Sequence, residues 1–268
     1  MSERRRDADS RSIVVRLYFE SQRLLSRFTL LLGAASTGFW LGVLSRGQLN
    51  SIAERHYRGQ RFYRTDAWNT QGLFDWERRV LERELAGCRR ILVAGAGGGR
   101  EVFALRRLGI DTDGFDSHPE LVRFANEMLE RKGMAPDIRW APWDRLPDIE
   151  GEYDAVIVGW GAYMHIRRRE RRVEFLRELR SVMAAGAPIL LSFFVTDEAS
   201  RYFRWVARIG NPLAWVLRRD PVRVGDSLAP HFSHYFTRER LERELTEGGF
   251  QMVRFEAEEY GHAIGRAA

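Results

Sequence analysis

Residues 91–101 read ILVAGAGGGRE, an apolar run that passes through a glycine-rich turn into a charged segment. The apolar run predicts a buried strand, and Glu101 to Leu108 predicts the helix that follows it. Glycine lets the backbone turn tightly and lets a ligand approach without a clash at Cβ. The start of the helix offers free N–H groups and the positive end of its dipole to an anion. The turn from Gly95 to Gly99 is therefore a candidate ligand-binding loop.

Strands and helices alternate along the chain on both sides of this loop. The predicted strands span 91–94, 112–115, 138–141, 153–158, 188–195, 251–257 and 260–264. The predicted helices span 101–108, 119–132, 168–183 and 238–247, the last with Thr237 as its N-cap. This order predicts an α/β, doubly wound sheet that is mostly parallel and has helices on both faces.

The remaining segments give the predicted domain organisation. Residues 1–12 are polar and charged, which predicts a disordered tail. Residues 13–86 are expected to form an N-terminal helical cap or lid, with two helices in 13–44 broken near Gly33 and a cluster of aromatic residues after them. Residues 87–268 are expected to hold the α/β domain, in which 200–230 is an insertion rich in tryptophan, arginine, proline and glycine.

Charge and cysteine content narrow the classes of partner. The net charge of +6 suits nucleic acid or an anionic membrane. Lys132 is the only lysine, however, and many arginines alternate with glutamate, which is typical of solvated helix faces, so nucleic acid is not expected as a partner. The single cysteine, Cys88, excludes an internal disulfide and favours a reducing, cytoplasmic location. The histidines lack metal-ligand spacing, so no metal is predicted.

One uncharged stretch lies between Arg27 and Arg46, from Phe28 to Ser45. Its length is at the lower edge of a membrane span, and its glycines, serines and threonines weaken the apolar signal. We expect a buried or lid helix here. The alternative is contact with a membrane surface, which would make the protein a peripheral membrane protein.

Two acidic residues follow the predicted strands next to the loop. Asp116 ends the second strand, where an acid can accept both hydroxyls of a ribose; the alternative role is the N-cap of the next helix. Asp144 follows the third strand and can accept an adenine amino group while Trp143 packs on a ring; the alternative is an ordinary loop aspartate. Carboxyl ends of parallel strands meet at one edge of a sheet, so the loop and both acids are expected to line one crevice.

These motifs together resemble the class I S-adenosylmethionine-dependent methyltransferases, from Arg89 to the C-terminus. The resemblance rests on the glycine loop, on Asp116 and on the WD pair at 143–144. It rests further on YDAVIVGW at 153–160 and on the segment from FT at 236–237 to GGF at 248–250. It implies a Rossmann-like seven-stranded sheet with one antiparallel strand, and S-adenosyl-L-methionine as cofactor. The cofactor-binding residues it implies are Gly95, Ala96, Gly97, Gly99, Glu101, Asp116, Ser117, Trp143, Asp144, Gly159 and Trp160.

One position departs from the family pattern. The family has an acid two residues before the first loop glycine, and that position is Val93 here. Glu101 can take over the contact with the methionyl ammonium, or it can serve only as a first-turn acid of its helix. The departure leaves open an alternative function, a cofactor-binding module without catalysis.

Methyl transfer from a sulfonium requires alignment and the exclusion of water, and for some acceptors a base. The predicted base is His165, which follows the fourth strand; a packing histidine is the alternative. Tyr163 has the same location and is predicted to orient the substrate. A second group, His231, His234 and Tyr235, either lines the acceptor pocket or belongs to a surface turn.

The predicted activity is methylation, at oxygen, of a small molecule with apolar surface. The fourth strand lacks the Asn/Asp-Pro-Pro-Tyr pattern of methyltransferases that act on amides and nucleobase amines. A nicotinamide-binding domain is disfavoured because Arg100 takes the last glycine position of GxGxxG. A polyamine-synthase-like aminopropyltransferase, another alternative, would need an acid after the fourth strand, where the sequence reads Gly159-Trp160-Gly161. No oligomeric state is predicted.

Overall fold

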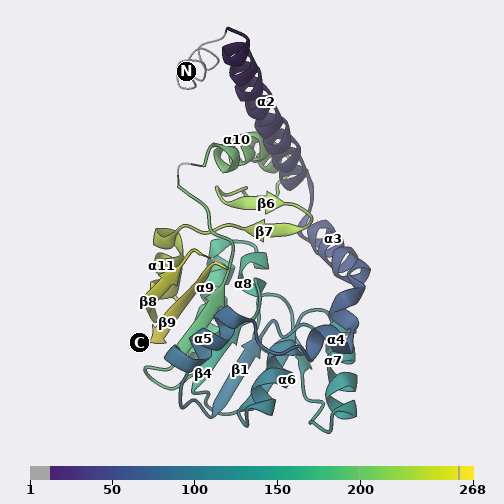
Figure 1. Cartoon of the computed structure of the whole chain (residues 1–268), viewed down its shortest axis with the longest axis vertical. Helices are drawn as coiled ribbons and strands as arrows, with labels where there is room; N and C mark the ends of the chain where they lie inside the picture. The colour runs from purple at the N-terminus through teal and green to yellow at the C-terminus, as the bar shows by residue number, and fades with distance from the viewer. Residues whose placement is uncertain (1–12, 199, 259) are drawn as a thin grey trace, which may run out of the picture. The chain divides into compact units, whose positions relative to one another are not determined.

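The computed structural model describes residues 13–198, 200–258 and 260–268, which fall into two compact units (Figure 1). The sheet unit comprises residues 45–199 and 229–268, and the helix-pair unit comprises residues up to 44 and 200–228. The predicted disordered tail, 1–12, lies outside the described residues. The predicted boundary at residue 86 does not coincide with the boundary between units, because residues 45–86 belong with the sheet.

The sheet unit is built on a seven-stranded sheet with the order β3-β2-β1-β4-β5-β9-β8. Strand β9 is antiparallel to both of its neighbours, and the other pairings are parallel. The strands of the unit are β1 (Arg90–Ala94), β2 (Asp111–Asp116), β3 (Arg139–Trp140), β4 (Ala155–Val158), β5 (Pro188–Ser192), β7 (Phe232–His234), β8 (Phe250–Glu256) and β9 (His262–Ala267). This arrangement confirms the predicted doubly wound, mostly parallel sheet with one antiparallel strand. The last strand begins at residue 262 rather than at the predicted 260.

Helices cover both faces of this sheet because the central strands are apolar on both sides. In β1, Leu92 packs into one core together with helices α9 and α11, whereas Ile91 and Val93 pack into a second core with α5, α6 and α7. The helices of the unit are α3 (Arg46–Gly59), the 3-10 helix η1 (Arg61–Arg64), α4 (Asp66–Asn69), α5 (Asp75–Glu84), α6 (Arg100–Arg107), α7 (Pro119–Arg131), α8 (Ala162–His165), α9 (Arg169–Ser181) and α11 (Arg238–Glu247). Thr237 caps α11, as predicted, by accepting from the backbone N–H of Arg240.

A buried ion pair joins two of the helices on one face. The guanidinium of Arg172 in α9 donates to both carboxylate oxygens of Glu244 in α11, at 2.8 and 2.7 Å. The hydroxyl of Tyr163 donates to the same carboxylate at 2.7 Å. Burial alone would raise the pKa of Glu244, but the hydrogen bonds and the charge of Arg172 hold it below its usual range. The pair therefore stays ionised inside the core.

Glu244→Ala would remove the carboxylate and leave Arg172 charged and buried. Deleting one partner of a buried ion pair costs about 3–5 kcal/mol, so we expect the free energy of unfolding in urea to fall by that amount. Glu242→Ala, on the exposed face of the same helix, is the control and should change stability by less than about 0.5 kcal/mol. Equal losses in the two variants would contradict a stabilising role of the pair.

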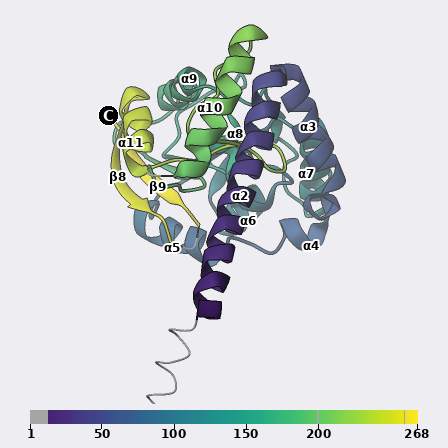
Figure 2. The ribbon, with the colours of Figure 1, turned by 90° about the horizontal axis from the view of Figure 1, so that it is seen from above.

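The helix-pair unit consists of α2 (Ile13–Val43), α10 (Arg201–Val216) and the short strand β6 (Asp226–Leu228). The two helices lie side by side (Figure 2) and meet at glycines. A Cβ on Gly38 would lie 2.6 Å from the carbonyl oxygen of Val206, and one on Gly42 would lie 2.5 Å from that of Gly210. Small residues thus bring the two backbones into contact, as in the small-residue interfaces of membrane helix pairs.

One prediction about this segment was wrong, and a second is confirmed only in part. Residues 13–44 were expected to form two helices broken near Gly33, but α2 is continuous, since a glycine inside a helix costs only about 1 kcal/mol. The stretch from Phe28 to Ser45 was expected to be a buried or lid helix. Its side chains toward α10 are buried, but Leu32, Phe39 and others remain exposed, and Ser45 is the N-cap of α3. The predicted insertion at 200–230 contains the helix α10.

Candidate functional site

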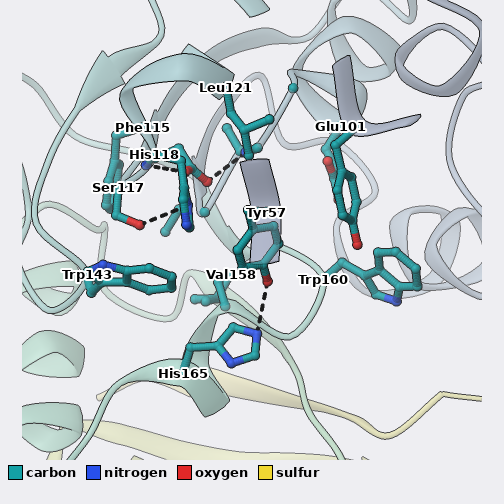
Figure 3. Close-up of a pocket in the computed structure, with 18 of the residues that line it drawn as sticks. Tyr57, Glu101, Phe115, Ser117, His118, Leu121, Trp143, Val158, Trp160 and His165 are labelled. Carbon is teal, nitrogen blue, oxygen red and sulfur yellow. Dashed lines mark hydrogen bonds and ion pairs between the residues drawn. The ribbon is translucent and has the colours of Figure 1, made fainter. Parts of the chain in front are cut away.

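A cleft opens in the sheet unit beside the ends of β1, β2 and β4 (Figure 3). The predicted cofactor residues that line it are Gly95, Ala96, Gly97, Glu101, Asp116, Ser117, Trp143 and Trp160; Gly99, Asp144 and Gly159 are not among its lining residues. The aromatic segment before the sheet contributes Tyr57, Tyr63, Trp68 and Asn69 to the same wall. The sheet edge and the preceding helices therefore form one site.

The glycine loop requires glycine for its backbone conformation and for the closeness of its neighbours. Gly95, Gly97 and Gly99 have φ angles of 74°, 54° and 92°, where other residues are strained. A Cβ on Gly95 would lie 2.4 Å from the Cβ of Ala162, and one on Gly98 would lie 2.4 Å from the carbonyl oxygen of Tyr63. At Gly97 a Cβ would meet nothing within 4 Å. Bare backbone at Gly97 thus faces open space in the cleft, as a bound ligand requires.

Asp116 holds this loop in place. Its Oδ2 accepts from the N–H of Gly97 at 2.8 Å, and its Oδ1 accepts from the N–H of His118 at 2.8 Å. His118, rather than Asp116, occupies the N-cap position of α7, so the alternative role of Asp116 as the helix cap does not apply. Oδ2 keeps one lone pair for a ligand, whereas Oδ1 also faces the ring of His118. The predicted contact with two ribose hydroxyls thus stays a prediction.

His118 is a residue of the cleft that our sequence analysis missed. Its Nδ1 lies 3.2 Å from Oδ1 of Asp116, so the carboxylate oxygen accepts and Nδ1 carries the proton. The other nitrogen, Nε2, is buried and finds no hydrogen-bond partner among the described residues. Its ring packs edge-on against Trp143, at 4.5 Å between centroids. A buried acceptor without a partner in a cleft fits a ligand that donates a hydrogen bond there.

Glu101 lines the cleft but is already paired. Arg100 donates to Glu101 at 2.6 Å and to both oxygens of Glu77, and its guanidinium lies over the ring of Phe74. Burial raises the pKa of Glu101, and the charge of Arg100 acts against that rise. The side chains of Arg100, Glu77 and Glu101 are at most 7% exposed. The role predicted for Glu101, contact with the methionyl ammonium, thus stays a prediction.

Asp144 points to a different partner than the sequence suggested. Its Oδ2 accepts from Arg46 of α3 at 2.8 Å and lies 3.9 Å from Nε of Arg171. The side chain does not line the cleft, although Trp143 next to it does. This arrangement favours a structural tie between α3 and the β3–β4 connection over the predicted contact with adenine.

His165 and Tyr57 form a hydrogen-bonded pair within the cleft (Figure 3). Nδ1 of His165 lies 2.9 Å from the carbonyl oxygen of Phe232, which can only accept, so Nδ1 carries the proton. Nε2 is then an acceptor, and the hydroxyl of Tyr57 donates to it at 3.3 Å. Burial, with a contribution from His231, lowers the pKa of His165 to about 3. The predicted base is therefore a neutral imidazole at physiological pH.

The rings in contact with His165 are aromatic, and the charge of Asp116 also acts on both members of the pair. The ring of His165 lies 4.6 Å from that of His231, whose pKa is also lowered by burial, and 6.2 Å from Trp143. Burial holds the pKa of Tyr57 far above its usual value. In the described part of the chain, no group of three or more His, Cys, Asp or Glu side chains has the arrangement of a metal site.

Tyr163 lies away from the cleft. It is fully buried, donates to Glu244 and stacks on Phe236 at 5.4 Å between ring centroids. In this position it supports α11, so we do not assign it the predicted substrate-orienting role. Of the second predicted group, His231 joins the cluster at His165, whereas Tyr235 packs on Phe194.

The shifted pKa of His165 predicts a specific pH dependence of stability. Because the folded pKa is about 3 and the unfolded value is 6.5, the unfolded chain binds the proton first as pH falls. The contribution of the neutral His165 to the free energy of unfolding is thus fully present above pH 6.5. It is lost as the pH falls toward 3, by at most about 1.4 kcal/mol per pH unit.

We therefore expect the difference in free energy of unfolding between the wild type and His165→Gln to shrink from about pH 7 to about pH 4.5. Urea denaturation at each pH measures it. A difference that stays constant over this range would show that the imidazole is not held neutral.

Comparison with known protein families supports a methyltransferase domain. Residues 91–186, which run from β1 to the turn before β5, match the family model described as a methyltransferase domain. No curated protein sequence matches the chain.

Solved structures share the fold. An S-adenosylmethionine-dependent methyltransferase from Methanosarcina mazei aligns with a TM-score of 0.58 and 19% identity over 73% of this chain and 98% of that one. The 1,6-didemethyltoxoflavin-N1-methyltransferase of Burkholderia thailandensis was solved with 1,6-didemethyltoxoflavin and S-adenosylhomocysteine. It aligns with a TM-score of 0.57 and 15% identity over 84% of this chain and 92% of that one. The mitomycin 7-O-methyltransferase aligns with a TM-score of 0.55 and 16% identity over 90% of this chain and 67% of that one. At these identities the likeness concerns the fold.

Proposed function

We propose that the chain is a class I S-adenosylmethionine-dependent methyltransferase that methylates an oxygen atom of a small molecule with apolar surface. Its cofactor is S-adenosyl-L-methionine. The observation that carries the proposal is the cleft in which the bare backbone of Gly97, the carboxylate of Asp116 and the neutral pair of Tyr57 and His165 meet.

The residues of the cleft fit the cofactor by their chemistry. The glycine loop and the N-terminus of α6 offer backbone N–H groups to the methionyl carboxylate. Oδ2 of Asp116 offers one acceptor to the ribose, and the unpartnered Nε2 of His118 offers one more acceptor beside it. Trp143 and Leu121 supply apolar surface for a base. The cofactor contributes an activated methyl group on a positively charged sulfur, so the protein needs only to align the acceptor and exclude water.

The acceptor side of the cleft supports a hydroxyl more than an ammonium group. The rings next to His165 belong to Tyr57, Trp143 and His231, all uncharged. A protonated amine would lose its hydration among these rings, and the carboxylate of Asp116, whose charge acts on His165, is already engaged by Gly97 and His118. A hydroxyl that takes the place of the Tyr57 hydroxyl can donate to Nε2 of the neutral histidine, which then accepts the proton as the O–methyl bond forms and the methyl–sulfur bond breaks. This argument supports oxygen as the acceptor atom.

The apolar character of the acceptor rests on the aromatic wall. Trp68 and Trp160 lie 5.8 Å apart between centroids, and Trp160 packs on Phe74 as well. Such a wall suits a ring or another apolar group, as small-molecule sites do. The proposal also keeps the cytoplasmic location predicted from the single cysteine.

The cofactor site can be tested by calorimetry with S-adenosylhomocysteine. Asp116→Ala removes the ligand acceptors and releases the loop, so we expect binding to weaken by about 10- to 100-fold. Asp111→Ala, at the opposite and exposed end of the same strand, is the matched control and should bind as the wild type does. Absence of binding to the wild type at high micromolar ligand would contradict the proposal.

The reaction itself can be tested with labelled S-adenosyl-L-methionine and a metabolite extract, followed by mass spectrometry. We expect the label in an O-methylated product, and we expect His165→Gln to lower the rate by about 100-fold without changing affinity for S-adenosylhomocysteine. The rate should show no fall through pH 6.5, since the imidazole titrates near 3. Cofactor binding without any product would favour the non-catalytic module, and transfer of an aminopropyl group would favour the aminopropyltransferase.

A further inference from the structure

Helix α2 of the helix-pair unit carries an uncovered apolar face along its whole length. The positions 14, 17, 21, 25, 28, 32, 35 and 39 follow one another at steps of three or four, and all except Ser21 are apolar. Among them, Val14 is 68% exposed, Phe28 62% and Leu32 61%. Soluble proteins rarely leave so long an apolar strip in water. Length and composition are also sufficient for α2 to cross a membrane.

The charged side chains of α2 lie on the other side of the helix. Arg16, Glu20, Arg23 and Arg27 are also spaced by three or four residues and form one stripe. The same stripe continues into Ala34, Gly38 and Leu41, which are buried against α10. α10 therefore covers the side of α2 that continues the charged stripe, and it leaves the apolar strip open. This pattern is typical of a helix that lies in the plane of a membrane interface.

Helix α10 ends in a second group of exposed apolar side chains. Trp215 is 83% exposed, Val216 is 68% exposed, and Leu217 follows at 41%. Arg218 and Arg219 come directly after them. Tryptophan beside arginine is a common combination at the boundary between lipid and water, since the ring enters the headgroup layer and the guanidinium binds phosphate.

The positive charge of the protein is concentrated in this unit. Residues 13–44 and 200–228 contain nine arginines and three acidic residues, whereas the sheet unit has 30 Lys and Arg against 31 Asp and Glu. A second copy of the chain would bring two sets of nine arginines together. An anionic surface attracts them instead, so charge complementarity favours a lipid bilayer over self-association.

We propose that the helix-pair unit binds the surface of an anionic lipid bilayer, with the apolar strip of α2 and the end of α10 buried among the acyl chains. The arginines of both helices contact the lipid phosphates at the rim of this surface. The interaction goes beyond the methyltransferase activity and does not depend on it, because the cleft belongs to the sheet unit.

Flotation of the full-length chain with vesicles tests the proposal. We expect binding to phosphatidylcholine vesicles that contain phosphatidylglycerol, at least about tenfold weaker binding to phosphatidylcholine alone, and a strong decrease in high salt. Equal binding to both vesicle types would overturn the role of charge. Absence of binding to either would overturn the proposal as a whole.

The variant Phe28→Glu with Leu32→Glu places two charges on the apolar strip and should reduce vesicle binding by at least about tenfold. Gln22→Glu with Ser26→Glu adds the same charges at the same spacing to exposed polar positions of the same helix and is the matched control. Affinity for S-adenosylhomocysteine should be equal in all variants, since the cleft lies in the sheet unit. Equal losses in both double variants would overturn the assignment of the apolar strip.

Sedimentation of the protein without lipid tests the alternative that a second copy of the chain covers this surface. We expect the same mass for the wild type and for Phe28→Glu with Leu32→Glu. A dimer that this variant dissociates, together with no binding to vesicles, would assign the strip to a second copy of the chain and contradict the proposal.

Discussion

The carboxylate of Asp116 is the interaction on which the site depends. It joins the end of β2 to the glycine loop after β1 through the N–H of Gly97, and it fixes both the backbone and the ring of His118. The two strands are neighbours in the sheet, so one side chain holds three parts of the cleft wall together. A loop whose glycines have positive φ would otherwise sample many conformations. The fixed loop keeps its bare backbone turned to the cleft before any ligand binds.

Burial controls the chemistry of the site as much as hydrogen bonding does. The aromatic residues before the sheet line the cleft, and burial keeps His165 and His231 neutral. A neutral imidazole next to a hydroxyl suits an uncharged acceptor, whereas the acidic side chains of the cleft wall, Glu101 and Asp116, already have partners. The cleft thus has a polar region at the glycine loop and an aromatic region at His165.

The two compact units divide the properties of the chain between them. The sheet unit is nearly neutral, carries the cleft and buries its ion pair between Arg172 and Glu244. The helix-pair unit holds the excess of arginine and an apolar strip that its own helices do not cover. Composition of the whole chain averages these two patterns. The high isoelectric point therefore describes the helix pair rather than the catalytic part.

The sequence alone determined the alternating strands and helices, the parallel sheet, the glycine loop and the place of Asp116 beside it. These features depend on local periodicity and on backbone conformations that only glycine adopts easily. Tertiary structure alone decided the partners of the longer side chains. Asp144 turns to Arg46, Tyr163 turns to Glu244, and His118 enters the cleft, because each contact joins segments or orientations that spacing along the chain does not encode. The exposure of α2 could not be predicted from the sequence either, because it depends on which side of the helix α10 covers.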